Sequence, residues 1–257
     1  MVEYLGGFIV CERQDHRIRF IEYNDVSTFA GTGTKGIQDG PKEQSHWSWP
    51  NDVVLFRNSL FIADYGNNRV RVIDAHGMVS SSGNGTEVSK DGAYDAEEAS
   101  FRCPFGIALM MDHLYVTDQL GHCLREIDVN TKQVRTMGGS RDRHSFVDGA
   151  LADAKFHHPK GLASCPDGSI VLCDYWSHRI CRISLDTNSV ETILVTEHED
   201  VRKEGPPDIL TSVPLRTPKQ PYFICASEDG HLYWTCNSSK QLHILFDAVQ
   251  PYSLPRK

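Results

Sequence analysis

The sequence predicts an all-β protein built from one repeated, four-stranded unit. Two observations support this prediction: a pattern that returns at intervals of a little over fifty residues, and short apolar runs rich in Val, Ile, Tyr and Phe between polar turns. No segment has the sustained apolar spacing of three and four residues that an amphipathic helix needs. Each unit opens with a large apolar residue three places before a proline, as in Trp47 to Pro50, Phe101 to Pro104, Phe156 to Pro159 and, more weakly, Leu215 to Pro218.

Four strands are expected in each unit. The first follows the proline, as in residues 161–163, and the second is an apolar run that ends in an acidic residue. The third alternates apolar residues with arginine, as in residues 178–183, and the fourth is a further short run such as residues 190–193. Such runs, bounded by Gly, Asp, Asn and Ser, are typical of strands. The acidic residues that end the second strands are Asp64, Asp118 and Asp174.

Repetition of four short antiparallel strands at this spacing is typical of the blades of a β-propeller, in which radial repetition leaves only short strand edges. A single blade cannot bury both of its faces, so neighbouring blades stabilise one another. We therefore predict a β-propeller of about five four-stranded blades, or six if a degenerate blade is shared by the termini. The blades are expected within one domain spanning residues 1–257, at about residues 1–31, 47–82, 101–139, 156–195 and 215–254.

The order of residues within a unit resembles the NHL repeat, which forms a family of β-propellers. Two positions depart from the pattern: Asp52 replaces the glycine that follows the proline in other units, and Pro221 disturbs the last unit. The third full copy matches best, through Asp148-Gly149, Ala152, Ala154, Phe156, Pro159, Gly161-Leu162-Ala163, Asp174 and His178-Arg179-Ile180.

Members of this family are most often six-bladed, whereas five units are counted in this sequence. Three explanations stay open: a true five-bladed ring, a degenerate sixth blade shared by the termini, and a shortened chain whose opening strand lies outside this sequence. We favour five blades with imperfect closure. An open ring has two unpaired strand edges, and we expect these edges to allow self-association or capture of a partner.

Composition and charge narrow the class of partner. With 40% hydrophobic residues the chain can bury a sizeable core, and a formal net charge of −8 argues against nucleic acid as the partner. No apolar run approaches the roughly 18 residues of a membrane helix, and Met1 to Val10 lacks the basic start of a signal peptide. We therefore expect a soluble, cytoplasmic protein with no membrane partner.

The eight cysteines never occur as C-x-x-C, so we expect reduced thiols that pack as small apolar residues.

Two repeated features could indicate a bound group but have simpler explanations. Residues 31–36 spell G-x-G-x-x-G, yet no helix is expected after them, and similar glycines recur ahead of later Asp-Gly pairs. They are interpreted as loops between blades. The acids at the strand ends recur from unit to unit, which favours a turn hydrogen bond over catalysis. Asn68, His122 and His178 follow these acids by four residues, and the alternative is a metal-binding ring of histidines.

His157 and His158 lie outside this register, immediately before Pro159. With an acidic residue they could hold a zinc ion or supply a general base, as in propeller lyases that resemble this family. We expect adjacent side chains to point opposite ways along an extended segment, which disfavours chelation of one ion. We therefore predict no bound metal, no cofactor and no catalytic residue.

The aromatic residues of the turns are the candidates for ligand contact. Tyr65, Tyr175 and Trp176 follow the acid-terminated strands, and Arg69 and Arg179 lie shortly after them. Aromatic residues and arginine are enriched at interaction hot spots. The leading hypothesis is a non-catalytic scaffold that binds a protein or peptide through its loop faces. The alternatives are a metal-dependent propeller enzyme, lactonase-like or amidating-lyase-like, and, with less support, a protein that binds single-stranded RNA.

Overall fold

The computed structural model describes residues 1–83, 85–86, 89–93, 99–140, 145–195, 220–236 and 242–245. In this part of the chain the structure is all-β, with three short 3₁₀ turns and no α-helix, and its five sheets are the blades of a β-propeller. The predicted fold class is confirmed. The chain divides into two compact units, Met1–Thr136 and Met137–Lys257, which we call the N-terminal and C-terminal units. The single domain over residues 1–257 stays a prediction.

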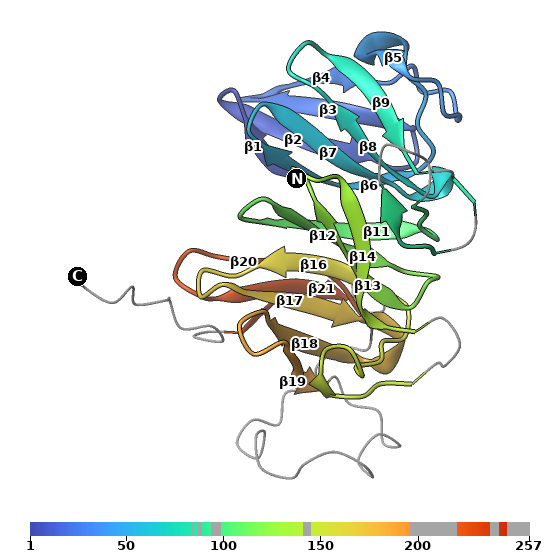
Figure 1. Cartoon of the computed structure of the whole chain (residues 1–257). Coiled ribbons are helices and arrows are strands. Elements are labelled where there is room, and N and C mark those ends of the chain that lie inside the picture. Colours follow the sequence, from blue (N-terminus) through green and yellow to red (C-terminus); the bar gives the residue numbers. More distant parts are fainter. Residues whose placement is uncertain are drawn as a thin grey trace, which may run out of the picture. The chain divides into compact units, whose positions relative to one another are not determined.

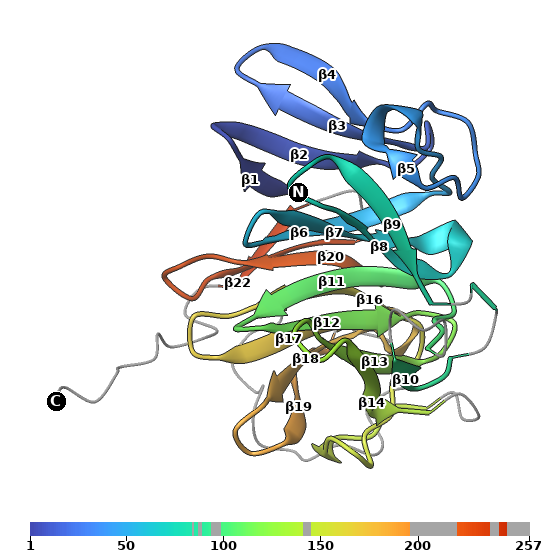
Figure 2. The same cartoon turned by 45° about the horizontal axis from the view of Figure 1, so that its top comes forward.

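The N-terminal unit begins with a four-stranded antiparallel sheet and continues with a five-stranded one (Figures 1 and 2). The strands of the first sheet lie in chain order: β1 (Val2–Tyr4), β2 (Gly7–Glu12), β3 (Arg17–Glu22) and β4 (Asp25–Ala30). The second sheet has the order β5-β9-β8-β7-β6, with the bounds β5 (Gly40–Pro41), β6 (Pro50–Phe56), β7 (Ser59–Asp64), β8 (Arg69–Ile73) and β9 (Met78–Ser82).

A third sheet follows with the same arrangement, β10-β14-β13-β12-β11, and its last strand extends past the boundary of the unit at Thr136. The 3₁₀ turns of the N-terminal unit are η1 (Lys42–Gln44) and η2 (Tyr65–Asn67). The strands of the third sheet are β10 (Gly92–Ala93), β11 (Pro104–Met110), β12 (His113–Asp118), β13 (Cys123–Asp128) and β14 (Gln133–Gly139).

The C-terminal unit contains one five-stranded sheet, ordered β15-β19-β18-β17-β16, and one three-stranded sheet, ordered β20-β21-β22. The turn η3 (Tyr175–Ser177) joins β17 to β18. The strands of the five-stranded sheet are β15 (Gly149–Ala150), β16 (Pro159–Ser164), β17 (Ser169–Asp174), β18 (Arg179–Ser184) and β19 (Ser189–Val195). Those of the three-stranded sheet are β20 (Pro221–Ala226), β21 (Leu232–Cys236) and β22 (Leu242–Leu245).

The short outer strands β5, β10 and β15 were not expected from the sequence. Each contains the glycine of an Asp-Gly pair and adds two residues to the outer edge of its sheet, as Gly40 does opposite Val79. The preceding aspartate explains why these loops reach the edge. Asp39 pairs with the buried Arg71, and its carboxylate also accepts a hydrogen bond from the Ser81 N–H at 2.9 Å.

The start of the last blade differs from the prediction. Pro221, not Pro218, is the equivalent of Pro50: it begins β20 and lies opposite Cys236, as Pro50 begins β6 and lies opposite Asp64. Pro221 is tolerated because a first strand residue needs no ladder N–H. Residues 215–219, 237–241 and 246–254 of the predicted fifth unit lie outside the described residues.

Adjacent sheets bury apolar faces against each other within each unit. In the N-terminal unit, Ile9 and Ile18 of the first sheet pack with Trp47, Leu60 and Ile62, and all five are at most 2% exposed. None of the eight cysteines, all of which lie in the described segments, forms a disulfide, and five are buried, which agrees with a packing role. None of the helices in the described segments has the length and apolar character needed to cross a membrane.

Candidate functional site

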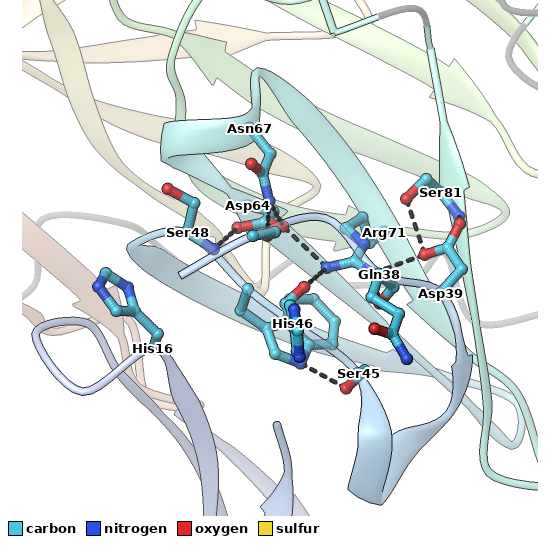
Figure 3. Close-up of polar contacts among 12 residues, drawn as sticks. His16, Gln38, Asp39, Ser45, His46, Ser48, Asp64, Asn67, Arg71 and Ser81 are labelled. Atoms are coloured by element: carbon cyan, nitrogen blue, oxygen red, sulfur yellow. Dashed lines mark hydrogen bonds and ion pairs between the residues drawn. The ribbon is translucent and has the colours of Figure 1, made fainter. Parts of the chain in front are cut away.

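The acid at the end of β7 lies in a buried network with arginine (Figure 3). The Asp64 carboxylate accepts hydrogen bonds from the Ser48 N–H at 2.9 Å, from Asn67 at 2.7 Å and from the Arg71 guanidinium at 3.1 Å. Arg71 also donates to the backbone oxygen of His46 and to the Asp39 carboxylate. The side chains of Asp64 and Arg71 are both 0% exposed. The network therefore fixes the loop before Pro50 to the sheet.

The third sheet repeats this network with Asp118. Its carboxylate accepts hydrogen bonds from the Arg102 N–H at 2.6 Å and from Arg125 at 3.4 Å, and Arg125 also pairs with Asp91 at 2.8 Å. The predicted turn role of these acids is confirmed, because each holds the backbone of the loop before the proline. These buried acids are structural residues.

The C-terminal unit places its arginine differently. Asp174 accepts hydrogen bonds from the His157 N–H at 2.6 Å and from Arg179 at 2.9 Å, and Arg179 also pairs with Asp148. Arg179 is five residues after the acid, whereas Arg71 is seven residues after Asp64. Residues two apart on a strand share a face, so an arginine five or seven residues after the acid can place its guanidinium beside the carboxylate of that acid. Arg179 is only 1% exposed, so we remove it from the predicted ligand contacts.

Burial governs the titration of these acids. It raises the pKa of Asp64 to about 6, against the opposing charge of Arg71 and the hydrogen bonds to the carboxylate. Burial also raises the pKa of Asp118 and of Asp174. In both cases the paired arginine and a backbone N–H oppose the rise. Perturbed carboxyl groups can mark active sites, but these are enclosed in structural ion pairs.

The residue four places after the acid connects one blade to the next. His16, Asn68 and His178 all have left-handed backbone conformations, with φ of 54°, 56° and 53°. Each side chain accepts a hydrogen bond from the backbone N–H that precedes the next blade's proline. The donors are Trp49 to His16 at 3.1 Å, Cys103 to Asn68 at 2.9 Å and Gln220 to His178 at 3.2 Å. This contact gives His16, Asn68 and His178 a structural role at the start of the next blade.

An exposed aromatic group lies on the loops of the C-terminal unit. Trp176, in η3, is 52% exposed, and its backbone N–H donates to the His157 oxygen at 3.0 Å. The Trp176 ring lies 5.5 Å from that of His157 and 5.3 Å from that of His158, measured between centroids. We call these three residues the Trp176 platform. It is a compact aromatic surface, held by a backbone hydrogen bond between two loops.

The expectation that His157 and His158 point opposite ways is wrong. Their ring centroids are 5.3 Å apart, and both rings lie beside Trp176. The reason is that His158 has a φ of 53°, so the chain turns at this residue, whereas alternation of side chains holds only in an extended strand.

Tyr175, which the sequence suggested as a ligand contact, is buried below the surface. It is 8% exposed, and its ring makes an edge contact with Tyr222 at 5.9 Å. The Lys160 ammonium lies 3.5 Å from the Tyr175 ring centroid and 3.9 Å from that of Tyr222. Such cation–π contacts stabilise a buried lysine. Sequence reasoning missed Lys160, although a charged residue just after Pro159, at the start of an apolar strand, could have indicated it.

The N-terminal unit has a corresponding contact around Tyr65. The Tyr65 ring packs on Phe105 at 6.1 Å and lies under the Arg13 guanidinium at 4.6 Å. Tyr65 and Arg69 are both partly buried. The exposed indole of this unit is Trp49, 36% exposed, with the Lys35 ammonium 4.3 Å from its ring.

The repeat can be recognised from its own sequence. Residues 156–183 match the model of the NHL repeat family, and this stretch includes the loop before Pro159, Asp174 and Arg179. The chain is an NHL-repeat β-propeller.

Among curated proteins, NHL repeat-containing protein 2 of Bos taurus is 37% identical over 208 residues, which are 75% of this chain and 28% of that protein. The protein of the same name in Gallus gallus is 26% identical over an alignment of 275 residues, gaps included, which covers 92% of this chain and 37% of that protein. Protein SUPPRESSOR OF QUENCHING 1, chloroplastic, of Arabidopsis thaliana is 29% identical over 206 residues, covering 73% and 19%. The NHL chain thus spans well under half the length of these relatives.

Solved structures share the fold of this NHL chain at low sequence identity. A gluconolactonase from Xanthomonas campestris superposes with a TM-score of 0.63 at 13% identity, over 95% of this chain and 70% of that one. A chain of the nidogen/laminin complex gives a TM-score of 0.52 at 12% identity, over 91% and 87%. These similarities show the propeller fold alone.

The glycine-rich stretch 31–36 is a loop between two NHL blades. No helix follows it directly, and its backbone N–H groups bond to the chain itself, from Gly31 to the Lys42 oxygen at 2.8 Å and from Gly36 to the Trp47 oxygen at 3.1 Å. Gly31 has a φ of +96°, and a Cβ there would lie 2.8 Å from the Trp47 ring. The glycine is required by packing and backbone conformation, which supports the loop interpretation over a nucleotide site.

Proposed function

We propose that this NHL-repeat chain is a non-catalytic interaction scaffold whose C-terminal unit binds a peptide segment at the Trp176 platform. The observation that carries the proposal is the half-exposed indole of Trp176, held by a backbone hydrogen bond and flanked by two imidazole rings. Tryptophan is enriched at binding hot spots because it offers a large, rigid contact area. A rigid scaffold that presents such loops is suited to binding.

The layers beneath the platform support this function. Tyr175, Lys160 and Tyr222 form a packed cation–π group below η3, and Asp174 with Arg179 fixes both loops to β18. The platform is therefore organised before a ligand arrives, which reduces the entropy lost on binding. The chemistry of the platform favours a peptide with an aromatic or aliphatic anchor residue that stacks on the indole.

The repeated acids offer little to a hydrolytic alternative. Asp64, Asp118 and Asp174 are each 0% exposed and paired with arginine. The likeness to gluconolactonases concerns the fold, at 13% to 16% identity. The binding hypothesis rests on a surface that the described residues present at Trp176.

The test is selection of peptides from a random displayed library on the immobilised protein, followed by measurement of their affinity for variants. Trp176→Ala is expected to weaken the selected peptides by at least about tenfold, which is the effect of losing a hot-spot residue. Trp176→Phe is expected to retain part of the affinity. Met111→Ala is the matched control, because Met111 is 85% exposed and lies in a hairpin turn of the other unit.

Two results would overturn the proposal. One is that the selected peptides bind Trp176→Ala as tightly as the unaltered chain, which would place binding elsewhere. The other is that no peptide is enriched on the unaltered protein. Circular dichroism spectra of each variant confirm that loss of binding does not result from unfolding.

A further inference from the structure

One residue of the N-terminal unit has an unfavourable backbone conformation. Trp49 has a φ of 53°, in the left-handed region that bulky side chains rarely adopt. It also precedes Pro50, and a proline ring restricts the preceding residue to extended conformations. A sparsely populated conformation of this kind persists only where the surrounding contacts impose it. The contacts of the peptide group between Ser48 and Trp49 therefore hold Trp49 in place.

Hydrogen bonds fix both ends of this Ser48–Trp49 peptide. Its oxygen, on Ser48, accepts a hydrogen bond from the Gly66 N–H at 2.7 Å. Its N–H, on Trp49, donates to Nδ1 of His16 at 3.1 Å. The preceding N–H, that of Ser48, donates separately to the Asp64 carboxylate at 2.9 Å (Figure 3). Of the two bonds to the peptide itself, the one to His16 uses a side chain that titrates between about pH 5 and 8.

The surroundings of His16 keep its imidazole neutral at neutral pH. Burial and the positive charge of Lys35 lower the pKa of His16, and the negative charge of Asp15 opposes this change. Lys35 lies in the loop before β6, with its ammonium 4.3 Å from the centroid of the Trp49 ring, and Asp15 lies in the turn of His16 itself. A neutral imidazole has one nitrogen that accepts a hydrogen bond, and the Trp49 N–H occupies it. The structure thus corresponds to the neutral form of His16.

Protonation converts His16 from an acceptor into a donor. Both nitrogens of an imidazolium carry a hydrogen, so Nδ1–H then faces the Trp49 N–H and the bond between them is lost. A half-turn of the Ser48–Trp49 peptide removes this conflict, because it points the Ser48 oxygen at Nδ1–H. The same half-turn changes the φ of Trp49 by about 180°, from 53° to about −127°. That value lies in the extended region, which the residue before a proline favours.

The half-turn also has a cost, which preserves the left-handed conformation at neutral pH. It turns the Ser48 oxygen away from the Gly66 N–H and breaks that hydrogen bond. With neutral His16, the half-turn loses the bonds at both ends of the peptide. With protonated His16, one of these bonds is already absent and a charge-assisted bond forms in the turned peptide. The balance between the two orientations of the peptide therefore depends on the charge of His16.

We propose that His16 is a pH-sensitive switch for the Ser48–Trp49 peptide. Neutral His16 accepts the Trp49 N–H and holds the left-handed conformation, and protonated His16 donates to the Ser48 oxygen of the turned peptide. Because the Trp49 nitrogen moves in the half-turn, the Cα–Cβ bond is redirected and the exposed indole shifts relative to Lys35. This surface of the N-terminal unit then depends on pH. The switch does not rest on the proposed peptide binding, which uses the Trp176 platform of the other unit.

The next blade contains the same contact without a titratable group. Asn68 takes the place of His16, and its side-chain oxygen accepts the Cys103 N–H at 2.9 Å. Cys103 has a φ of 61° and, like Trp49, precedes a proline. A side-chain amide does not titrate, so His16→Asn is expected to keep Trp49 in the left-handed conformation over the range in which His16 titrates. This variant is the matched control.

Nuclear magnetic resonance of the full chain labelled with ¹³C-tryptophan tests the proposal, since Cα and Cβ shifts report backbone conformation. The Trp49 signals are assigned by their loss in Trp49→Phe. In the unaltered protein they are expected to move from left-handed to extended values as the pH falls, with a midpoint below about 6.5. In His16→Asn they are expected not to move. In Lys35→Gln the midpoint is expected at a higher pH, because the charge that lowers the pKa of His16 is gone.

The proposal fails in either of two cases. In the first, the Trp49 signals keep left-handed values while the ring protons of His16 titrate. In the second, His16→Asn shows the same transition as the unaltered protein, which would assign it to another group. Asp64, whose pKa burial raises to about 6, is present in both proteins and therefore does not contribute to the difference between them. Circular dichroism spectra at each pH establish that each variant is folded.

Discussion

Replacing Arg71 with cysteine would make the second blade resemble the fourth. After Asn68 the chain has arginine at both positions that face the buried acid, Arg69 and Arg71. After His178 it has arginine first and cysteine second, and Arg179 alone reaches the acid. We therefore expect Arg69 to take over the ion pair with Asp64 in Arg71→Cys. In the unaltered protein the Arg69 guanidinium lies beside Gly85. To reach Asp64 the Arg69 side chain has to change its rotamer and occupy the space left by Arg71, which is on the same face of β8.

The third blade supplies the comparison. There Cys123 occupies the first position and Arg125 the second, so Arg125→Cys leaves Asp118 with no arginine to replace the lost one. Breaking a buried ion pair on one side costs about 3–5 kcal/mol of the free energy of unfolding. We expect Arg125→Cys to lose an amount in this range. If Arg69 replaces Arg71 as the partner of Asp64, the loss in Arg71→Cys is expected to be only about 1–2 kcal/mol. The difference between the losses in Arg125→Cys and Arg71→Cys then measures the free energy that the new Arg69–Asp64 ion pair restores.

Equilibrium urea unfolding, followed by far-ultraviolet circular dichroism, measures both losses. The double variant Arg69→Ala with Arg71→Cys removes the rescue and is expected to be as unstable as Arg125→Cys. Arg69→Ala alone is expected to cost about 1 kcal/mol or less, because Arg69 is only partly buried. Equal losses in Arg71→Cys and Arg125→Cys, with additive effects in the double variant, would refute the reasoning.

Two further predictions concern the contacts between blades. Gly161→Ala places a Cβ 2.7 Å from the backbone oxygen of Tyr222. This overpacking is expected to lower the free energy of unfolding by about 1–3 kcal/mol, measured by the same urea unfolding. An unchanged urea midpoint would contradict the close approach of Gly161 to Tyr222. Removal of the His16 acceptor in His16→Ala is expected to cost about 1 kcal/mol, whereas His16→Asn should be nearly neutral, because Asn68 performs this role in the next blade. Burial and the charge of Lys35 lower the pKa of His16, so its contribution is complete above the unfolded-state value of about 6.5 and declines as the pH falls through the folded-state pKa. Unfolding measured across this pH range should show a smaller decline in His16→Asn, and identical pH profiles would count against the hydrogen bond.

Some parts of the site followed from the sequence because they repeat. Asp64, Asp118 and Asp174 recur at one position of the unit, and a residue that serves every blade was expected to have a turn role, as the structure confirms. Other parts are unique and gave no periodic signal. Lys160 lies among Pro159, Gly161 and apolar residues, and only the approach of Tyr175 and Tyr222 shows why a lysine is buried there.

The sequence of the last blade was misread for a similar reason. Pro218 follows the large apolar residue Leu215 at the expected distance of three, so the local pattern favoured it over Pro221. Strand pairing decides the matter, since Pro221 lies opposite Cys236. A short motif can match at two nearby positions, but only one of them places the following residues in register with the neighbouring strand.

The amino-acid sequence alone determined the period, the four strands of a blade and the repeated acid, because strand alternation and turn chemistry are properties of neighbouring residues. Only the tertiary structure decided which arginine reaches each acid, which way His158 turns and which aromatic side chains meet solvent. Arg179 and Trp176 are three residues apart, yet one is buried and the other exposed. The exposed fractions of these two side chains differ because of the loops that pack against η3 and β18. Contacts between segments distant in the chain cannot be predicted from the pattern of neighbouring residues.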